Sequence, residues 1–194
     1  MGRGDQGEDR DGPGLAMNCA WRSRRVVLDA PAMTSAIRIW ARSSHHAAFR
    51  CGGWAWVRDD GRGEPTGQAG GTRDTTAARM ALAGLVAALK DAPQGPLVLD
   101  LAAPVLARAV HRLAQGPAFT AEEAPAEDLD LWAQLATAVA GRAVAFTPAG
   151  EPFKGGPAAF AQAWAELAQD KAKAAGPFVA AIPRANLAKL KLPI

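Results

Sequence analysis

Hydrophobic and polar positions alternate at several points between residues 37 and 146. The run Ile37-Arg38-Ile39-Trp40 alternates and predicts a first strand, and residues 53–57 predict a second. Asp59-Asp60-Gly61 is typical of a tight hairpin turn, which leads into a glycine-rich third strand over residues 66–72. An apolar run over 96–101 favours a buried parallel strand, and residues 142–146 complete a predicted set of five.

Helical periodicity separates the later strands. Four apolar residues recur at i, i+3, i+4 and i+7 and predict an amphipathic helix: Leu82, Leu85, Val86 and Leu89. Asp74, Thr75 and Thr76 precede this helix and supply side chains that can cap its first N–H groups. Similar spacing predicts further helices over 104–113, 128–140 and 158–174, with loops over 41–50, 116–126 and 147–157. The order β-β-β-α-β-α-α-β-α predicts an α/β domain with a mixed sheet.

Length and composition fit one domain with extensions. A chain of 194 residues with 49% apolar content can bury a sizeable core. Residues 1–32 are rich in Gly, Asp and Arg, so we interpret them as a disordered extension or the product of a misplaced start codon. We expect the folded domain over 33–175 and an apolar, weakly basic tail over 176–194.

Charge and cysteine usage set few limits on the partners. The net charge of +3 permits an acidic partner without requiring one, because the chain has no dense Lys/Arg run. No apolar run approaches the roughly 20 residues that span a bilayer, so we expect no membrane partner. Cys19 and Cys51 show no motif spacing, and the N-terminus has no apolar secretory segment. These features predict a cytoplasmic protein with free thiols.

Residues 70–90, GGTRDTTAARMALAGLVAALK, resemble the signature segment of the ribonuclease H family, written close to G-x-x-x-T-T-N-N-R-M-E-L-x-A. The matching residues are Thr75, Thr76, Arg79, Met80 and Leu82. Residues 52–57, GGWAWV, resemble the family's G-G-Y/W-x-x-V strand, and residues 130–135 resemble its D-L-W-x-x-L helix. The resemblance covers about residues 37–173. It implies a ribonuclease H-like fold, with a five-stranded mixed sheet and helices on both faces.

The resemblance also implies where a catalytic site would lie. The family cleaves the RNA strand of an RNA–DNA hybrid with two Mg²⁺ ions held by four carboxylates. The first three of these positions are occupied here by Arg42, Ala81 and Leu101. The fourth aligns with Ala161, Gln162 or Ala165. At the first position, the Arg42 guanidinium stays charged and repels a metal. None of the residues at the other three positions is acidic, so the chain departs from the family pattern at every position.

Asp100 does not repair this pattern in a regular strand, because it points to the opposite face from Leu101. The sequence therefore favours a protein without catalytic residues, metal or cofactor. Mg²⁺ is expected only if activity is retained.

The first functional hypothesis is a catalytically inactive ribonuclease H-like protein that still binds an RNA–DNA hybrid or another nucleic acid. The candidate contact residues are Arg42, Ser43, Ser44, Thr75, Thr76 and Arg79. Arg50, Arg58 and Arg73 add positive charge nearby in the sequence, which suits phosphate groups. Ala77 and Ala78 replace two asparagines that contact the minor groove in the family, which weakens this hypothesis.

Two further hypotheses stay open. The fold can serve as a protein-interaction scaffold, with the C-terminal tail contacting a protein partner. Alternatively, the chain is a Mg²⁺-dependent hybrid ribonuclease with relocated carboxylates at Asp74, Asp100 or Glu166. A zinc site is not predicted, because His45, His46 and Cys51 offer three ligands where a structural zinc site uses four.

Overall fold

The computed structural model describes residues 36–116, 125–147 and 155–192. The chain divides into two compact units, Met1–Ala32 and Met33–Ile194, and all the described residues belong to the second. The predicted N-terminal extension lies outside the described residues, as do parts of the predicted loops 116–126 and 147–157.

Strands and helices follow one another along the described residues nearly in the predicted order. The strands are β1 (Ile37–His46), β2 (Cys51–Asp59), β3 (Thr66–Arg73), β4 (Leu97–Leu101), β5 (Val144–Phe146) and β6 (Phe178–Ala181). The helices are the short 3₁₀ helix η1 (Ala47–Phe49), α1 (Ala77–Lys90), α2 (Pro104–Gln115), α3 (Leu129–Val139), α4 (Pro157–Ala175) and α5 (Arg184–Leu187).

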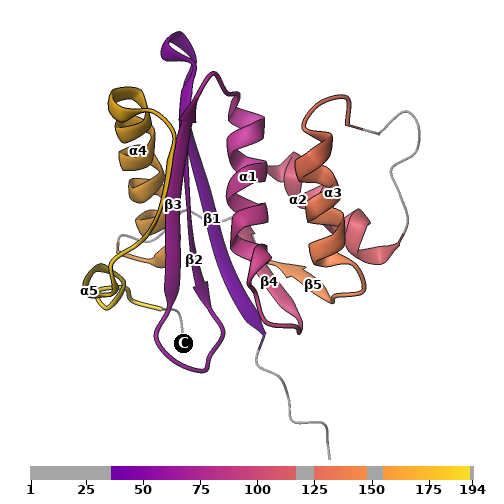
Figure 1. The fold of residues 1–194 in the computed structure, drawn as a ribbon. Helices are drawn as coiled ribbons and strands as arrows, with labels where there is room; N and C mark the ends of the chain where they lie inside the picture. Colours follow the sequence, from indigo (N-terminus) through magenta and orange to yellow (C-terminus); the bar gives the residue numbers. More distant parts are fainter. Residues whose placement is uncertain (1–35, 117–124, 148–154, 193–194) are drawn as a thin grey trace, which may run out of the picture. The chain divides into compact units, whose positions relative to one another are not determined.

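The strands form one mixed sheet in the order β5-β4-β1-β2-β3-β6. Strands β1, β2 and β3 pair antiparallel, whereas β4 pairs parallel with both β1 and β5. Helix α4 covers one face of the sheet and α1 the other; α3 packs against α1, and α2 packs against α3 (Figure 1). The predicted fold class is confirmed: a mixed α/β sheet with helices on both faces.

The predicted number of five strands was wrong, because β6 adds a sixth. It pairs antiparallel with β3 at the sheet edge, inside the segment expected to form a tail. The run Phe-Val-Ala-Ala is short, has no polar alternation and is largely exposed. Its strand conformation comes from pairing with β3 rather than from a local pattern.

Strand β1 is also longer than the predicted run over 37–40. It continues to His46, because antiparallel pairing with β2 extends along its length to the His46–Cys51 pair. Helix η1 and Arg50, which adopts a left-handed conformation with φ 46°, complete the connection to β2. Much of the loop expected over 41–50 is therefore strand.

The sheet separates two clusters of buried side chains. One lies on the α1 face and includes Ile39, Trp54, Leu85 and Val110. The other lies under α4 and is built largely from small residues, with Ile182 and Leu187 of the C-terminal segment added to it. Gly53 allows the close approach of α4, because a Cβ at this position would collide with the backbone of Ala165 and Gln169.

Candidate functional site

A pocket of about 300 Å³ lies where β1, the end of β4 and the beginning of α1 meet. Arg42, Ala81 and Leu101 all line it. The fold thus brings together the three residues that the sequence resemblance aligned with the first three carboxylate positions of the family pattern. Most of the other lining residues are alanines, including Ala77 and Ala78, so the described lining is largely apolar.

Arg42 supplies the charge in this pocket, and that charge is paired within the protein. Its side chain is only 8% exposed, and Nη2 lies 2.6 Å from Oδ1 of Asp100. Nη1 donates to the backbone carbonyls of Ala41 at 2.9 Å and Asp100 at 2.8 Å. These charge-assisted bonds satisfy a guanidinium that would otherwise be costly to bury.

Strand register explains why Asp100 reaches Arg42. Asp100 pairs with Trp40 across the parallel β1–β4 ladder. Side chains two residues apart on a strand share a face, so Trp40 and Arg42 project to the same side. Asp100 therefore lies diagonally across from Arg42.

The residues of this pocket do not fit a pair of Mg²⁺ ions. Hard divalent cations need several anionic oxygens, and none of the described lining residues is acidic. Asp100, which contacts the pocket residue Arg42, already binds that guanidinium. Within residues 36–116, 125–147 and 155–192, no group of three or more His, Cys, Asp or Glu side chains could hold a metal ion.

The residues aligned with the fourth carboxylate position offer no acidic side chain either. Ala161 and Ala165 are buried against the sheet, and Gln162 donates from Nε2 to Oε1 of Glu166 at 2.8 Å. Asp74 is 82% exposed and faces Arg50 across 3.9 Å. Asp74, Asp100 and Glu166 each have a separate partner.

The beginning of α1 is fixed by Thr75 and Thr76. The hydroxyl of Thr76 accepts a hydrogen bond from the backbone N–H of Arg79 at 3.1 Å, which confirms its predicted capping role. The Thr75 backbone N–H donates to the Arg50 carbonyl at 3.2 Å, and its own carbonyl lies 3.0 Å from Nε2 of His45. The helix start is thus tied to the β1–β2 connection.

The Thr75 side chain has an unusual environment. It is 5% exposed, and its hydroxyl has no hydrogen-bond partner among the described residues. A buried hydroxyl without a partner costs free energy, and it lies next to the N-terminus of a helix, where anions are stabilised.

The remaining candidate residues take part mainly in structural contacts. Arg79 forms an ion pair with Asp128 just before α3 and lies 3.9 Å from Asp130. Ser43 lines the pocket, and the Ser44 hydroxyl donates to Oε1 of Gln169 on α4 at 2.6 Å.

Arg50, Arg58 and Arg73, which lie near the candidate residues in the sequence, differ in how free their guanidinium groups are to contact a phosphate. Arg73 donates from Nε to the carbonyl of Ala172 at 3.1 Å and so caps the end of α4. Arg58 donates to the carbonyl of Ala88, and burial lowers its pKa, partly offset by Asp60 and Asp91. Arg50 is 71% exposed, and its ion pair with Asp74 spans 3.9 Å, so it has the most open guanidinium of the three.

Two partners in this region were absent from the sequence-based set: Gln169 on α4, and Asp100 as the counter-ion of Arg42. Asp100 shares a face with Arg42 because of the register between β1 and β4, for which the sequence has no local signal. Gln169 comes close only through helix–sheet packing, for which the sequence has no local signal.

No protein-family model matches the chain, and no curated protein matches it. Solved structures do match. LC9-RNase H1, a type 1 RNase H with the type 2 active-site motif, is similar with a TM-score of 0.52 and 19% identity over 82% of this chain and 87% of that chain. The foamy viral protease-reverse transcriptase in complex with an RNA/DNA hybrid gives a TM-score of 0.56 and 14% identity over 86% of this chain and 22% of that chain.

The N-terminal RNase H domain of a Mycobacterium tuberculosis protein is also similar, with a TM-score of 0.50 and 16% identity over 72% of this chain and 96% of that chain. At these identities the likeness defines the fold. The protein has a ribonuclease H-like fold, as the sequence resemblance implied. None of the helices in the described part of the chain is long and apolar enough to cross a membrane.

Proposed function

We propose that this protein binds nucleic acid on its ribonuclease H-like fold without cleaving it. The observation that carries the proposal is the pocket shared by Arg42, Ala81 and Leu101. These are the residues that the sequence resemblance aligned with the family's carboxylates, and the described lining of the pocket has no acidic residue. The foamy viral structure in complex with an RNA/DNA hybrid shows a fold of this type with such a ligand, which supports a nucleic-acid partner here.

The beginning of α1 is the best-supported contact for a phosphate group. Its N-terminal N–H groups favour an anion, and the Thr76 hydroxyl there is exposed. The Thr75 hydroxyl is buried and does not reach a ligand, so Thr75 contributes through the position of its backbone. Arg50 stands beside it, because its carbonyl accepts from the Thr75 N–H while its guanidinium is 71% exposed. The start of α1, Thr76 and Arg50 together offer backbone, hydroxyl and guanidinium donors.

Arg42 has a different role in this proposal from the one inferred from sequence. A phosphate at Arg42 competes with Asp100 and with two backbone carbonyls. We therefore assign Arg42 chiefly to neutralising and closing the pocket. Ser43, Ser44 and Arg79 stay as flanking candidates for the nucleic-acid surface.

A protein-interaction scaffold is the second candidate function. The apolar lining of the pocket favours it, because alanine and leucine suit an apolar side chain better than a phosphate. The C-terminal tail adds less support than expected. Its β6 strand pairs with β3, and Ile182 and Leu187 are buried within the protein's own core.

The test combines binding and cleavage in one assay. A fluorescently labelled RNA–DNA hybrid is titrated with the full chain at low salt, with and without Mg²⁺, while anisotropy and product length are followed. We expect binding without cleavage, and affinity that falls as salt rises. Arg50→Ala should weaken binding, because its guanidinium is exposed, whereas the exposed control Lys189→Ala should not.

Two outcomes would contradict the proposal. Mg²⁺-dependent cleavage that Asp100→Asn abolishes would establish relocated catalytic carboxylates. An absence of binding at low salt would leave the scaffold function as the better explanation.

A further inference from the structure

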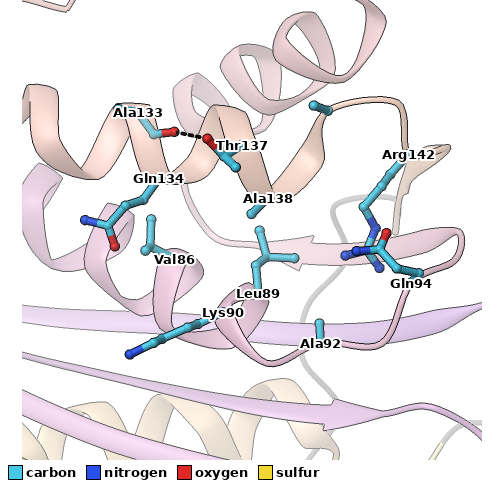
Figure 2. A pocket seen from close by; sticks show the side chains of 11 residues that line it. Val86, Leu89, Lys90, Ala92, Gln94, Ala133, Gln134, Thr137, Ala138 and Arg142 are labelled. Atoms are coloured by element: carbon cyan, nitrogen blue, oxygen red, sulfur yellow. Dashed lines mark hydrogen bonds between the residues drawn. The ribbon is translucent and has the colours of Figure 1, made fainter.

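A second pocket, of about 530 Å³, lies between the C-terminal halves of α1 and α3 (Figure 2). Helix α1 contributes Val86, Leu89 and Lys90, and α3 contributes several residues over 133–138. Gln94 of the α1–β4 connection and Arg142, just after α3, also line it. A pocket of this volume can hold a small molecule.

The pocket combines an apolar lining with polar groups. Val86 and Leu89 are buried, and the half-buried Ala138 faces them from α3, as Figure 2 shows. The Thr137 hydroxyl donates to the Ala133 carbonyl at 3.0 Å, so its proton is used within the helix. The apolar part is suited to an apolar ligand body.

The charges in the pocket are of one sign. Lys90 and Arg142 line it, and none of its described lining residues is acidic. Arg142 is 9% exposed and donates from Nε to the Gly95 carbonyl at 3.0 Å and from Nη2 to the Pro93 carbonyl at 2.8 Å. No ion pair joins it to a carboxylate among the described residues. Burial lowers the pKa of Arg142, which reflects the cost of holding this charge away from water.

The ends of α1 and α3 offset only part of this charge. The last carbonyls of a helix carry partial negative charge and stabilise a nearby cation. Several of these carbonyls are already used, because Leu89 accepts from the Ala92 N–H and Val139 accepts from the Arg142 N–H. Two neutral carbonyl bonds hold the guanidinium in place without neutralising it.

We propose that this pocket binds a small organic anion. Its apolar body would pack on Val86 and Leu89, and one carboxylate, sulfonate or phosphate group would pair with Arg142. Lys90 points away from Arg142 (Figure 2), so it would add attraction only at longer range. The pocket shares no lining residue with the one at Arg42, so the inference is independent of nucleic-acid binding.

The test uses two fluorescent probes with the same ring system and different charge. 1-Anilinonaphthalene-8-sulfonate is an anion, and N-phenyl-1-naphthylamine lacks the sulfonate. Titrated against the folded full chain, the sulfonate should bind saturably at one site. The uncharged probe should bind at least about tenfold more weakly, because it cannot form a charge-assisted hydrogen bond with Arg142.

Four variants localise the site. Ala138→Phe fills the pocket and should abolish sulfonate binding without removing the Arg142 hydrogen bonds, and Lys90→Ala should weaken it severalfold. Arg142→Met should weaken it at least as much, while Lys189→Ala, an exposed lysine outside the pocket, should leave it unchanged. Circular dichroism melts verify that each variant is folded. Equal affinity for the two probes, or sulfonate binding unaffected by both Ala138→Phe and Lys90→Ala, would overturn the proposal.

Discussion

Nη2 of Arg42 lies 2.6 Å from Oδ1 of Asp100 where β1 and β4 run in parallel. Each side chain neutralises the charge of the other in a poorly solvated position, because Arg42 is only 8% exposed and the Asp100 side chain 23%. A carboxylate bound this closely to a guanidinium is poorly placed to accept a metal ion. The same ion pair therefore stabilises the buried Arg42 and occupies the carboxylate that could otherwise contribute to a metal site.

Replacing Arg42 with Met should lower the free energy of unfolding by about 2–3 kcal/mol, because Asp100 loses its partner in a largely buried position. Urea denaturation followed by Trp fluorescence measures the loss. The double variant Arg42→Met/Asp100→Leu should recover most of it, since no unpaired charge is left. If the two single losses simply add in the double variant, the residues are not energetically coupled.

Magnesium should not change the melting temperature of the wild-type protein. The variant Arg42→Asp/Ala81→Glu/Leu101→Asp places three carboxylates around one pocket, where they repel one another until a cation binds. Millimolar Mg²⁺ should therefore raise the melting temperature of this variant alone. An equal rise in the wild type would mean that the natural residues already bind the ion.

Thr75→Val should separate stability from binding. Valine has nearly the same shape and removes a buried hydroxyl that has no partner in the described structure. We expect a stability change from neutral to about 1 kcal/mol in favour of the variant. Hybrid binding should stay unchanged in the same variant, because the buried hydroxyl does not reach a ligand. A clear loss of stability would show that the hydroxyl has a partner within the folded chain.

Gly53→Ala should destabilise the fold by about 3 kcal/mol or more, because the new methyl group meets the α4 backbone, which cannot rotate away. Gly63→Ala is the matched control, since nothing lies within 4 Å of a Cβ at that position. Thermal melts of the two variants compare the effects. Similar melting temperatures would contradict the close packing of α4 on β2.

Leu187→Ala should cost about 2–4 kcal/mol, because Leu187 is 3% exposed in the cluster under α4. Leu167→Ala, at a position 59% exposed on α4, should change stability by less than about 0.5 kcal/mol. Denaturant midpoints of the two variants measure the difference. Equal effects would show that the C-terminal segment adds little to the core.

Local signals predicted the elements whose structure is decided locally. The α1 stripe and the Thr76 cap were correct, because periodicity and capping involve residues within a few positions of one another. Strand β6 was missed, because its four largely exposed residues become a strand only by pairing with β3. The same reason explains the underestimated length of β1.

The sequence likewise predicted the residues of the candidate site but not their contacts. Alignment with a family pattern identified Arg42, Ala81 and Leu101, and the fold places them around one pocket. The chemistry of this pocket depends on contacts between distant segments, such as the ion pair of Arg42 with Asp100. The pocket at Arg142 had no sequence signal, because burial of that arginine results from how α1, α3 and their connections pack.

Strand β6 also determines what a partly synthesised chain exposes. It follows α4 in the sequence, so a chain that has reached the end of α4 presents β3 as an edge strand with unpaired N–H and C=O groups. Residues 69–71 of that edge, Ala-Gly-Gly, are small and offer no charge against pairing with another chain. β3 therefore stays an unpaired edge strand, open to pairing with another chain, until β6 pairs with it.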